Sequence, residues 1–327
     1  MEYLQCKIKP KTSFHIGVKE GSLEKTMHHI HSDTIFSGIC NTYRLLYGKD
    51  EIEGLLEKFK SNQPPFLISS AFPYADDIIF LPMPKYINFS DYTNDEKSLK
   101  KFKKIEFVSR EIIRNISQNK FKEELKEENI IQGKILVTEK ESEKIRNTSI
   151  WKEKEVARVV IDRKTNAPNI YYFGEVEYCD KCGLYFLIKF IGNEIRKKVE
   201  AAIRLLGDEG VGGDRSYGKG LFETKFSNFE WSIREGKFIN LSLYLPNKDE
   251  IEMIKKGWYE IVNRGGWVYS PDKKGERKRF VRMIKEGSTF EGDKEFYGRI
   301  IEVGTSEKHH HVYRYGYGMP LYFGGGT

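Results

Sequence analysis

A glycine-rich run in the second half of the chain combines residue types that contact nucleic acid. Residues 210–220 read GVGGDRSYGKG, with five glycines among eleven residues. Glycine allows positive φ angles and lets a ligand approach the main chain closely. Arg215 and Lys219 offer phosphate contacts, and Tyr217 offers a ring on which a base can stack. The run therefore predicts contact with an RNA backbone, with an ordinary surface turn as the alternative.

The same run matches most of a phosphate-binding P-loop, but two features exclude nucleoside triphosphate binding. Gly220 follows Lys219 at the position where a serine or threonine would bind magnesium. A P-loop also connects a strand to a helix that follows it. Here the spacing of apolar residues predicts a helix over residues 195–206, before the run, and residues 221–226 read as a strand after it.

Three histidines near the N-terminus, His28, His29 and His31, could act as general acids or bases or as metal ligands. Ser32 or Asp33 is a candidate N-cap for the helix that follows. Because a helix N-terminus accommodates a neutral histidine or an RNA phosphate, we expect His31 and Ser32 to contact RNA. Asp33 is interpreted as structural, with metal-assisted catalysis as the alternative.

Two cysteines, Cys179 and Cys182, have the spacing of one half of a zinc site. The other half is missing nearby, because Cys6 and Cys40 belong to segments that we expect to be buried. We therefore predict no bound metal, with a zinc ion at Cys179 and Cys182 as the alternative. We also expect no cofactor.

Bulk composition indicates an intracellular protein and is compatible with an acidic partner. The chain has 327 residues, enough for two domains, and a formal net charge of +7. The sequence pI of about 8.9 suits a partner such as RNA. No stretch is apolar for the length of a bilayer span, and the N-terminus lacks a signal-peptide core, so we expect a cytoplasmic protein with no membrane partner. Four cysteines also fit a reducing compartment.

Two further clusters have open interpretations. Basic residues are densest between positions 273 and 285, either for contact with phosphate or an acidic partner, or as a solvated loop. Three histidines occupy positions 309–311. We expect them at a strand edge that faces RNA or a partner subunit, and histidines without a role are an equal alternative.

Periodicity predicts an α+β fold in the first half of the chain. Residues 3–9 read as a strand, and a helix follows His31. Two strands are predicted at residues 66–72 and 78–81, followed by a mixed-charge helical region at residues 95–128. Strand, helix, strand, strand, helix is the order of a ferredoxin-like domain.

The second half repeats the opening of the first, with a strand at residues 184–191 and then a helix that ends near Leu206. Further segments are predicted as a short helix and several strands: a helix at 248–256 and strands at 221–231, 238–245, 257–269, 280–284 and 312–323. We therefore expect two ferredoxin-like (RRM-like) domains in tandem. The N-terminal one covers residues 1–150 with a helical insertion, and the C-terminal one covers residues 181–327 with the glycine-rich loop.

Between the two predicted domains, residues 151–180 carry the signal of a protruding β-hairpin. Residues 156–162 and 169–177 flank a basic tip that is rich in turn-forming residues. Arg158 and Arg163 on this hairpin would let it contact RNA. An ordinary surface hairpin is the alternative.

Four motifs in register carry a resemblance to a known family. They are HSDTIFSG at residues 31–38, ARVVIDR at 157–163, the glycine-rich run, and VYRYGYG at 312–318. From about residue 1 to residue 323, the chain resembles the RAMP subunit that caps the 5′ end of guide RNA in type III-A CRISPR (Csm) complexes. This is the fourth Csm subunit, which is related to the Cas-five family.

The resemblance implies a subunit without enzymatic activity that binds the 5′ repeat-derived tag of CRISPR RNA in antiviral defence. It also implies contacts with the large polymerase-like subunit and with the backbone RAMP subunit, and a hairpin that props the RNA between tag and guide. On this basis the predicted RNA-binding residues are His31, Ser32, Arg158, Arg163, Gly212, Gly213, Arg215, Ser216, Tyr217, Gly218, Lys219, Gly220, Arg314 and Tyr315. The alternative is a metal-independent CRISPR repeat endoribonuclease of the RAMP superfamily, with His31 as a catalytic group.

Overall fold

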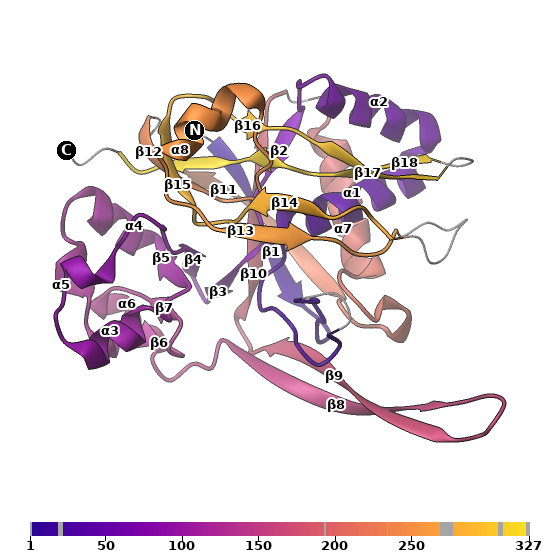
Figure 1. Cartoon of the computed structure of the whole chain (residues 1–327), viewed down its shortest axis with the longest axis horizontal. Helices are drawn as coiled ribbons and strands as arrows, with labels where there is room; N and C mark the ends of the chain where they lie inside the picture. The colour runs from indigo at the N-terminus through magenta and orange to yellow at the C-terminus, as the bar shows by residue number, and fades with distance from the viewer. Residues whose placement is uncertain are drawn as a thin grey trace.

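A computed structural model describes residues 2–18, 22–192, 194–233, 235–268, 277–306 and 310–324. One large mixed sheet runs through the centre of the described chain (Figure 1). Its strands lie in the order β11 (Phe222–Glu230), β1 (Glu2–Pro10), β10 (Cys182–Phe190), β3 (Phe72–Ala75), β4 (Ile78–Pro82), β5 (Phe107–Ser109), β7 (Ile135–Leu136) and β6 (Ile130–Ile131), and β2 (Phe66–Ile68) also pairs with β10.

Strand β1 lies inside this sheet and pairs antiparallel on both of its edges. Leu4 faces Ile188 of β10 on one side and Asn228 of β11 on the other. The order of predicted elements put β10 in a separate C-terminal domain, whereas in the structure β10 lies beside the first strand of the chain. Local periodicity identifies a strand but not its neighbour, because strand pairing brings together residues that are far apart in sequence.

Two helices connect these strands and pack against each other. Helix α1 (Ser32–Tyr47) leads from β1 to β2 and β3, and helix α7 (Arg196–Glu209) leads from β10 to β11. Both helices are amphipathic, and α7 buries its apolar stripe of Val199, Ala202 and Ile203. A further helix, α2 (Lys49–Lys60), follows α1 after a single residue and buries Phe59.

Residues 83–150 form a lobe at one end of the large sheet, in which short helices accompany the sheet strands β5, β6 and β7 (Figure 1). Its helices are η1 (Phe89–Asp91), α3 (Glu96–Phe102), α4 (Arg110–Ser117), α5 (Phe121–Glu124), η2 (Glu127–Asn129) and α6 (Glu139–Ile145). The predicted helical region at residues 95–128 is confirmed, although β5 interrupts it. Polar side chains cap the N-termini of several of these helices: at the start of α6, for example, Thr138 and Glu141 form a capping box. Apolar residues such as Ile112 and Ile113 of α4 face inward.

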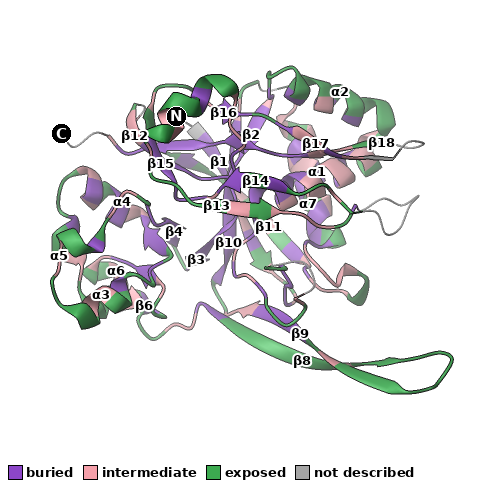
Figure 2. Ribbon diagram, viewed as in Figure 1, coloured by how far each residue is buried: buried purple, intermediate pink, exposed green. Residues whose placement is uncertain are grey.

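The predicted hairpin between the two halves of the chain is confirmed. Strands β8 (Trp151–Ile161) and β9 (Pro168–Tyr178) pair over their whole length and project away from the body of the protein (Figure 1). Most of the arm is exposed (Figure 2). At its tip, the Asp162 carboxylate accepts hydrogen bonds from the backbone N–H groups of Lys164 and Thr165, which closes the turn.

The C-terminal part of the chain consists of small sheets that cover the large one. They are β15-β12-β20, β13-β14, β16-β19 and β17-β18, with η4 (Lys248–Glu250) and α8 (Ile251–Lys255) after β12. The strand bounds are β12 Gly236–Asn240, β13 Ile261–Arg264, β14 Val281–Ile284, β15 Thr289–Gly292, β16 Tyr297–Gly298, β17 Ile301–Ser306, β18 His310–Arg314, β19 Tyr317–Gly318 and β20 Pro320–Tyr322.

The last strands complete the main hydrophobic core. Tyr315, Tyr317 and Leu321 are fully buried in the same cluster as the side chains of α1 and α2. The expected α+β class is confirmed. None of the helices in the described part of the chain is long and apolar enough to span a bilayer.

Phe59 tests this shared core. Its ring is fully buried and meets the rings of Phe36 and Phe66 edge-on, at 4.9 and 5.2 Å between centroids. We expect Phe59→Ala to lower the free energy of unfolding by about 3–5 kcal/mol, because it leaves a cavity. Phe280, which is 62% exposed, gives the matched control. Phe280→Ala should change the free energy of unfolding by less than about 0.5 kcal/mol. Denaturant titration followed by circular dichroism measures both, and equal losses would contradict the core assignment.

Candidate nucleic-acid interface

The glycine-rich run lies between a helix and a strand, as predicted. It follows α7 and precedes β11, and its centre is a short turn of helix, η3 (Arg215–Tyr217). Asp214 and Gly218 on either side of η3 are both in the left-handed region, with φ of 60° and 74°. This turn leaves the Tyr217 side chain 74% exposed, while Ser216 is exposed and Arg215 partly so.

Backbone hydrogen bonds hold this run against residues 11–16, which continue from β1. Gly213 N–H donates to the carbonyl oxygen of His15 at 2.8 Å, and Gly220 N–H donates to that of Ser13 at 2.9 Å. On its other side the same segment meets the hairpin, because Phe14 forms an isolated bridge with Val176 of β9. Residues 11–16 therefore join the glycine-rich run to the base of the hairpin.

Arg158 of the hairpin reaches the glycine-rich run directly. Its guanidinium forms an ion pair with Asp214 and lies 3.3 Å from a carboxylate oxygen of Glu175. The same group stacks over the rings of Phe173 and Tyr217, at 4.5 and 5.3 Å from their centroids. The structure thus brings together two predicted site residues, Arg158 and Tyr217, that come from different elements.

Lys219 completes this junction from the other end of the run. Its Nζ donates to the Ser13 hydroxyl and to Glu175 Oε2, each at 2.8 Å. The Ser13 hydroxyl also donates to Glu175 Oε2 at 2.6 Å. Sequence reasoning missed Glu175, because nothing in its local pattern marks an acidic residue that faces two cations across a fold.

Glu175 is the electrostatic centre of the junction. Burial would raise the pKa of its carboxyl, but hydrogen bonds from Lys219 and Ser13 and the charges of Lys219 and Arg158 hold that pKa below its usual value. Together with Asp214, Glu175 balances the charges of Arg158 and Lys219. These two cations hold the loop to the hairpin, and the groups presented to solvent are Tyr217, Arg215 and Ser216.

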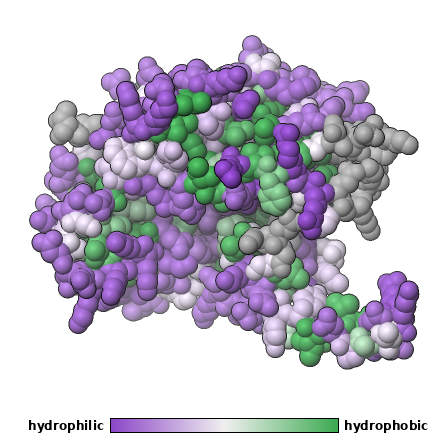
Figure 3. Space-filling model, in the orientation of Figure 1, coloured by the Kyte–Doolittle hydropathy of each residue, from purple (hydrophilic) through white to green (hydrophobic). Residues whose placement is uncertain are grey.

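The hairpin tip is a separate part of the predicted site. Arg163 is exposed there, at the far end of the arm from the glycine-rich run. Exposed apolar side chains accompany it: Val159, Val160, Ile161 and Ile170, each more than half exposed. Figure 3 shows these hydrophobic atoms on the projecting arm. Such a strip on a solvent-exposed arm is typical of a surface that contacts a partner.

The remaining predicted site residues lie in the interior. His31 is 3% exposed, and its Nδ1 lies 2.8 Å from Glu286 Oε1. The Ser32 backbone N–H donates to the hydroxyl of Ser70, and the Ser32 hydroxyl accepts from the backbone N–H of Leu243. The structure brings His31 and Ser32 close to the C-terminal strands rather than to the glycine-rich run.

Arg314 and Tyr315 are also buried, at 4% and 0% exposure. Arg314 forms an ion pair with Asp33 and donates to the carbonyl oxygen of Gly265 at 2.8 Å. The Tyr315 hydroxyl accepts a hydrogen bond from the backbone N–H of Ile68 at 3.0 Å, and its ring packs against Phe36. Neither side chain is presented to solvent in this structure.

The predicted N-cap of α1 is wrong. His31 occupies the N-cap position without a side-chain cap, and Asp33 lies within the helix. The Asp33 carboxylate instead pairs with Arg264, at 2.9 Å, and with Arg314. Burial would raise the pKa of Asp33, but the two guanidinium groups hold it well below its usual range. Two buried charged partners satisfy this carboxylate more strongly than backbone N–H groups would.

The other sequence candidates are distributed over the surface and the core. Cys179 and Cys182 have their sulfur atoms 3.0 Å apart, but among the described residues they belong to no group of three or more potential metal ligands. Lys273 and Lys274 of the basic cluster, and His309, lie outside the described residues. Arg277 stacks over Trp267, and Lys285 pairs with Glu260 at 3.2 Å.

Family models match most of the chain. Residues 7–223 match the RAMP superfamily, and residues 234–323 match the CRISPR Csm4 C-terminal domain. The chain therefore belongs to the RAMP superfamily, and the C-terminal match assigns it to the Csm4 type, as the sequence motifs predicted.

Relatives of this type are similar over nearly the whole chain. The CRISPR system protein Csm4 of Methanocaldococcus jannaschii is 29% identical over 349 residues, which covers 93% of this chain and 89% of the relative. That of Thermococcus onnurineus is 28% identical over 302 residues, covering 89% and 90%.

Solved structures of this type share the fold. A chain in the crystal structure of a Csm3–Csm4 subcomplex from a type III-A CRISPR-Cas interference complex is 24% identical, with a TM-score of 0.70 and coverage of 98% and 99%. A chain in the Csm1–Csm4 cassette bound to pppApA is 22% identical, with a TM-score of 0.61 and coverage of 98% and 97%.

Two glycines of the run allow a matched test of its packing. Gly220 and Gly218 have nearly equal φ angles, +76° and +74°, so alanine would strain the backbone similarly at both, by about 1–2 kcal/mol. A Cβ at Gly220 would lie 2.1 Å from the carbonyl oxygen of Val211, whereas nothing lies within 4 Å at Gly218. We expect Gly220→Ala to destabilise the protein clearly more than Gly218→Ala in urea titrations, and equal effects would contradict this packing.

Glu175 gives a test of the junction that depends on pH. Because its pKa is lowered in the folded state, its stabilising contribution is present above the unfolded value of about 4.3 and is lost as pH falls below it. We expect Glu175→Gln to lower the free energy of unfolding by about 1–3 kcal/mol at pH 7, because two cations lose a charged partner.

The difference in free energy of unfolding between Glu175→Gln and the unsubstituted protein should become smaller from about pH 5 downward. Glu155→Gln, at an exposed position of the same hairpin, serves as the control and should show little effect at any pH. Chemical denaturation at a series of pH values measures both variants. A difference that does not change with pH would show that Glu175 is not held as a carboxylate by these partners.

Proposed function

We propose that this chain is a non-catalytic subunit of a type III-A CRISPR (Csm) ribonucleoprotein that binds the 5′ repeat-derived tag of CRISPR RNA. The observation that carries the proposal is the junction of the glycine-rich run with strands β8 and β9 of the projecting hairpin. There the exposed ring of Tyr217 lies on the same short helical turn as Arg215, and Arg158 holds that turn in place through Asp214 and Glu175. Single-stranded RNA is bound by such combinations of stacking ring and basic group.

We further propose that the subunit links the large polymerase-like subunit to the backbone filament in antiviral defence. The similar chains in the solved structures occur in a Csm3–Csm4 subcomplex and in Csm1–Csm4 cassettes. The exposed apolar strip on the hairpin supports this proposal, because it gives the arm a surface for contact with a neighbouring subunit or with RNA. We place the assembly in the cytoplasm, in keeping with the free cysteines of the chain.

The roles of the predicted site residues divide by exposure. Tyr217 stacks on a base, and Arg215 and Ser216 contact the RNA backbone beside it, while Arg163 contacts RNA at the hairpin tip. The glycines at 212, 213, 218 and 220 give the loop its shape, and Arg158 and Lys219 fix its position. His31, Ser32, Arg314 and Tyr315 have a structural role in the interior instead, because their side chains are buried and contact other parts of the core.

We also propose that the body of the protein contains two ferredoxin-like units. The first uses β1, α1, β3, β10, α7 and β11, which follow one another as strand, helix, strand, strand, helix, strand. The helical lobe and the hairpin are then insertions between β3 and β10. The second unit lies in the small C-terminal sheets after β11. The first unit then extends to the end of β11 at Glu230, past residue 181, where the C-terminal domain was predicted to begin.

Ribonuclease activity has no support from the position of its candidate groups. His31 is buried and paired with Glu286, and Asp33 is paired with two arginines. A general acid or base must reach the proton it transfers. We therefore propose that the subunit binds RNA without cutting it.

A binding experiment separates the two functions. Purified protein is mixed with end-labelled repeat-derived RNA, with and without magnesium, and analysed on native and denaturing gels in parallel. We expect a slower-migrating complex on the native gel and full-length RNA on the denaturing gel. Shortened RNA would instead indicate cleavage. If the Asp33→Asn variant still shortens the RNA and the His31→Ala variant does not, the protein is the metal-independent nuclease.

Tyr217 provides the sharpest test of the proposed RNA site. Loss of one base stack costs about 1–3 kcal/mol, so Tyr217→Ala should weaken RNA binding about 5- to 150-fold at fixed salt. Tyr259→Ala is the matched control, because Tyr259 is an exposed tyrosine, 45% accessible, next to β13. Fluorescence anisotropy with single-stranded tag RNA measures both affinities. Equal affinities for the two variants would remove Tyr217 from the binding surface.

A further inference from the structure

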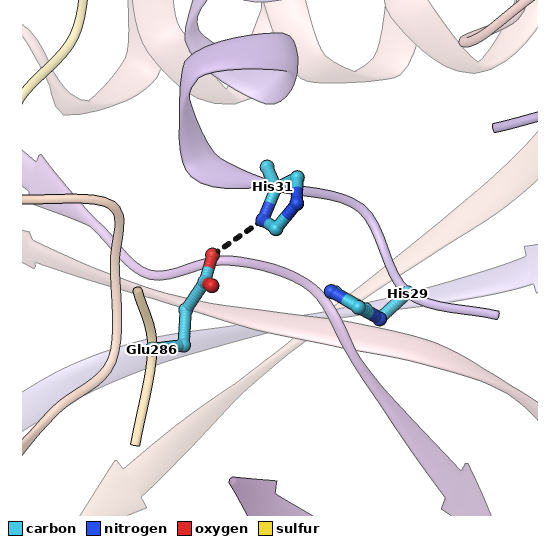
Figure 4. A group of neighbouring side chains, drawn as sticks. All are labelled: His29, His31 and Glu286. Carbon is cyan, nitrogen blue, oxygen red and sulfur yellow. Dashed lines mark hydrogen bonds and ion pairs between the residues drawn. The ribbon is translucent and has the colours of Figure 1, made fainter. Parts of the chain in front are cut away.

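Two histidines and a glutamate that are not used by the proposed RNA site converge in the interior. His29 and His31 lie just before and at the start of α1, and Glu286 lies in the turn after β14 (Figure 4). One potential ligand atom from each lies within 4.8 Å of the others, the only such group of three among the described residues. The ring of His29 extends toward the pair formed by His31 and Glu286.

The hydrogen bonds of this group leave ligand atoms unused. Glu286 is 5% exposed, and its Oε1 faces His31 Nδ1 at 2.8 Å and accepts from the Ser70 hydroxyl. Its second oxygen, Oε2, is buried and has no hydrogen-bond partner. Nδ1 of His29 is likewise buried without a partner. A buried polar atom without a partner costs about 1–3 kcal/mol, so two in one cluster point to a ligand that binds there.

We propose that His29, His31 and Glu286 bind a zinc ion. Two imidazole nitrogens and one carboxylate oxygen are a ligand set that zinc accepts, with water at the fourth position. Zinc–ligand bonds of about 2.0–2.2 Å place tetrahedral ligand atoms about 3.3–3.6 Å apart. Small side-chain rotations therefore convert the observed group into a coordination shell.

Charged side chains near the group act on a bound cation in opposite directions. The nearby cations Lys285 and Arg264 oppose binding, and Asp33 pairs with Arg264 and reduces that opposition.

The ion would replace the proton that His31 Nδ1 and Glu286 Oε1 share. The Ser70 hydroxyl, already bonded to the carboxylate, then orients it from outside the coordination shell. The ion ties the start of α1 to a turn that is 255 residues away in sequence. The proposal does not depend on RNA binding, because the ligands are buried and belong to none of the exposed groups around Tyr217.

Metal binding is tested with the full chain carrying Cys179→Ser and Cys182→Ser, which removes the competing thiol pair. After treatment with a chelator, the protein is titrated with zinc against a chromophoric competitor, and its thermal midpoint is recorded with and without the metal. We expect one equivalent to bind and the midpoint to rise, because a ligand that binds only the folded state stabilises it. No binding beyond that of weak surface sites would overturn the proposal.

Variants at neighbouring positions assign the ligands. His29→Gln and Glu286→Gln should each abolish stoichiometric binding, and His28→Gln should retain it. His28 is a sequence neighbour that is stacked on Trp151 and paired with Glu106, outside the proposed shell. Retained binding in His29→Gln and Glu286→Gln would also overturn the proposal.

Cobalt gives a readout that does not require these variants to fold. Added to the double-serine protein, Co²⁺ should produce the visible absorption of a four-coordinate site without a thiolate charge-transfer band. The weak spectrum of hydrated, six-coordinate cobalt would count against the site.

Discussion

The segment that continues from β1 holds the proposed interface together. Residues 11–16 carry backbone hydrogen bonds to the glycine-rich run and form a bridge to β9 of the hairpin. β1 is in turn fixed on both edges by β10 and β11. Because the run leads into β11 and the hairpin leads into β10, the central position of β1 brings both of them to the same end of the sheet.

Ion pairs then fix the side chains at this junction. Glu175 pairs with Arg158 and Lys219, and Asp214 also pairs with Arg158. The Arg158 guanidinium in addition stacks over the ring of Phe173. The charges that the sequence offers for RNA are therefore partly used within the protein. What remains for a ligand is an exposed tyrosine on a loop of fixed shape, and preorganised loops of this kind lose little entropy when they bind.

A second set of charges joins the N-terminal helix to the C-terminal strands. Asp33 lies between Arg264 and Arg314, and His31 faces Glu286, so the start of α1 is bound to three separate C-terminal segments. Breaking a buried charge pair leaves an uncompensated charge and costs more than the pair contributes. These contacts, with Tyr315 and Tyr317 in the shared core, make the two ends of the chain interdependent.

The sequence by itself determined the α+β class, the projecting hairpin, the helix before the glycine-rich run and the strand after it. It also identified the family, because short motifs in register survive where overall identity is low. These features depend on local spacing, on turn residues and on the order of elements, all of which can be read along the chain.

Only the tertiary structure decided which strands pair and which predicted site residues reach solvent. Arg314 and Tyr315 were predicted from the sequence as RNA contacts, yet both side chains are buried. Arg314 forms an ion pair with Asp33, and the ring of Tyr315 packs against Phe36. Glu175 and Glu286 were not predicted at all, since their roles depend on partners that are distant in sequence. Ion pairs, strand register and exposure are set by contacts between such distant segments, and no local pattern encodes them.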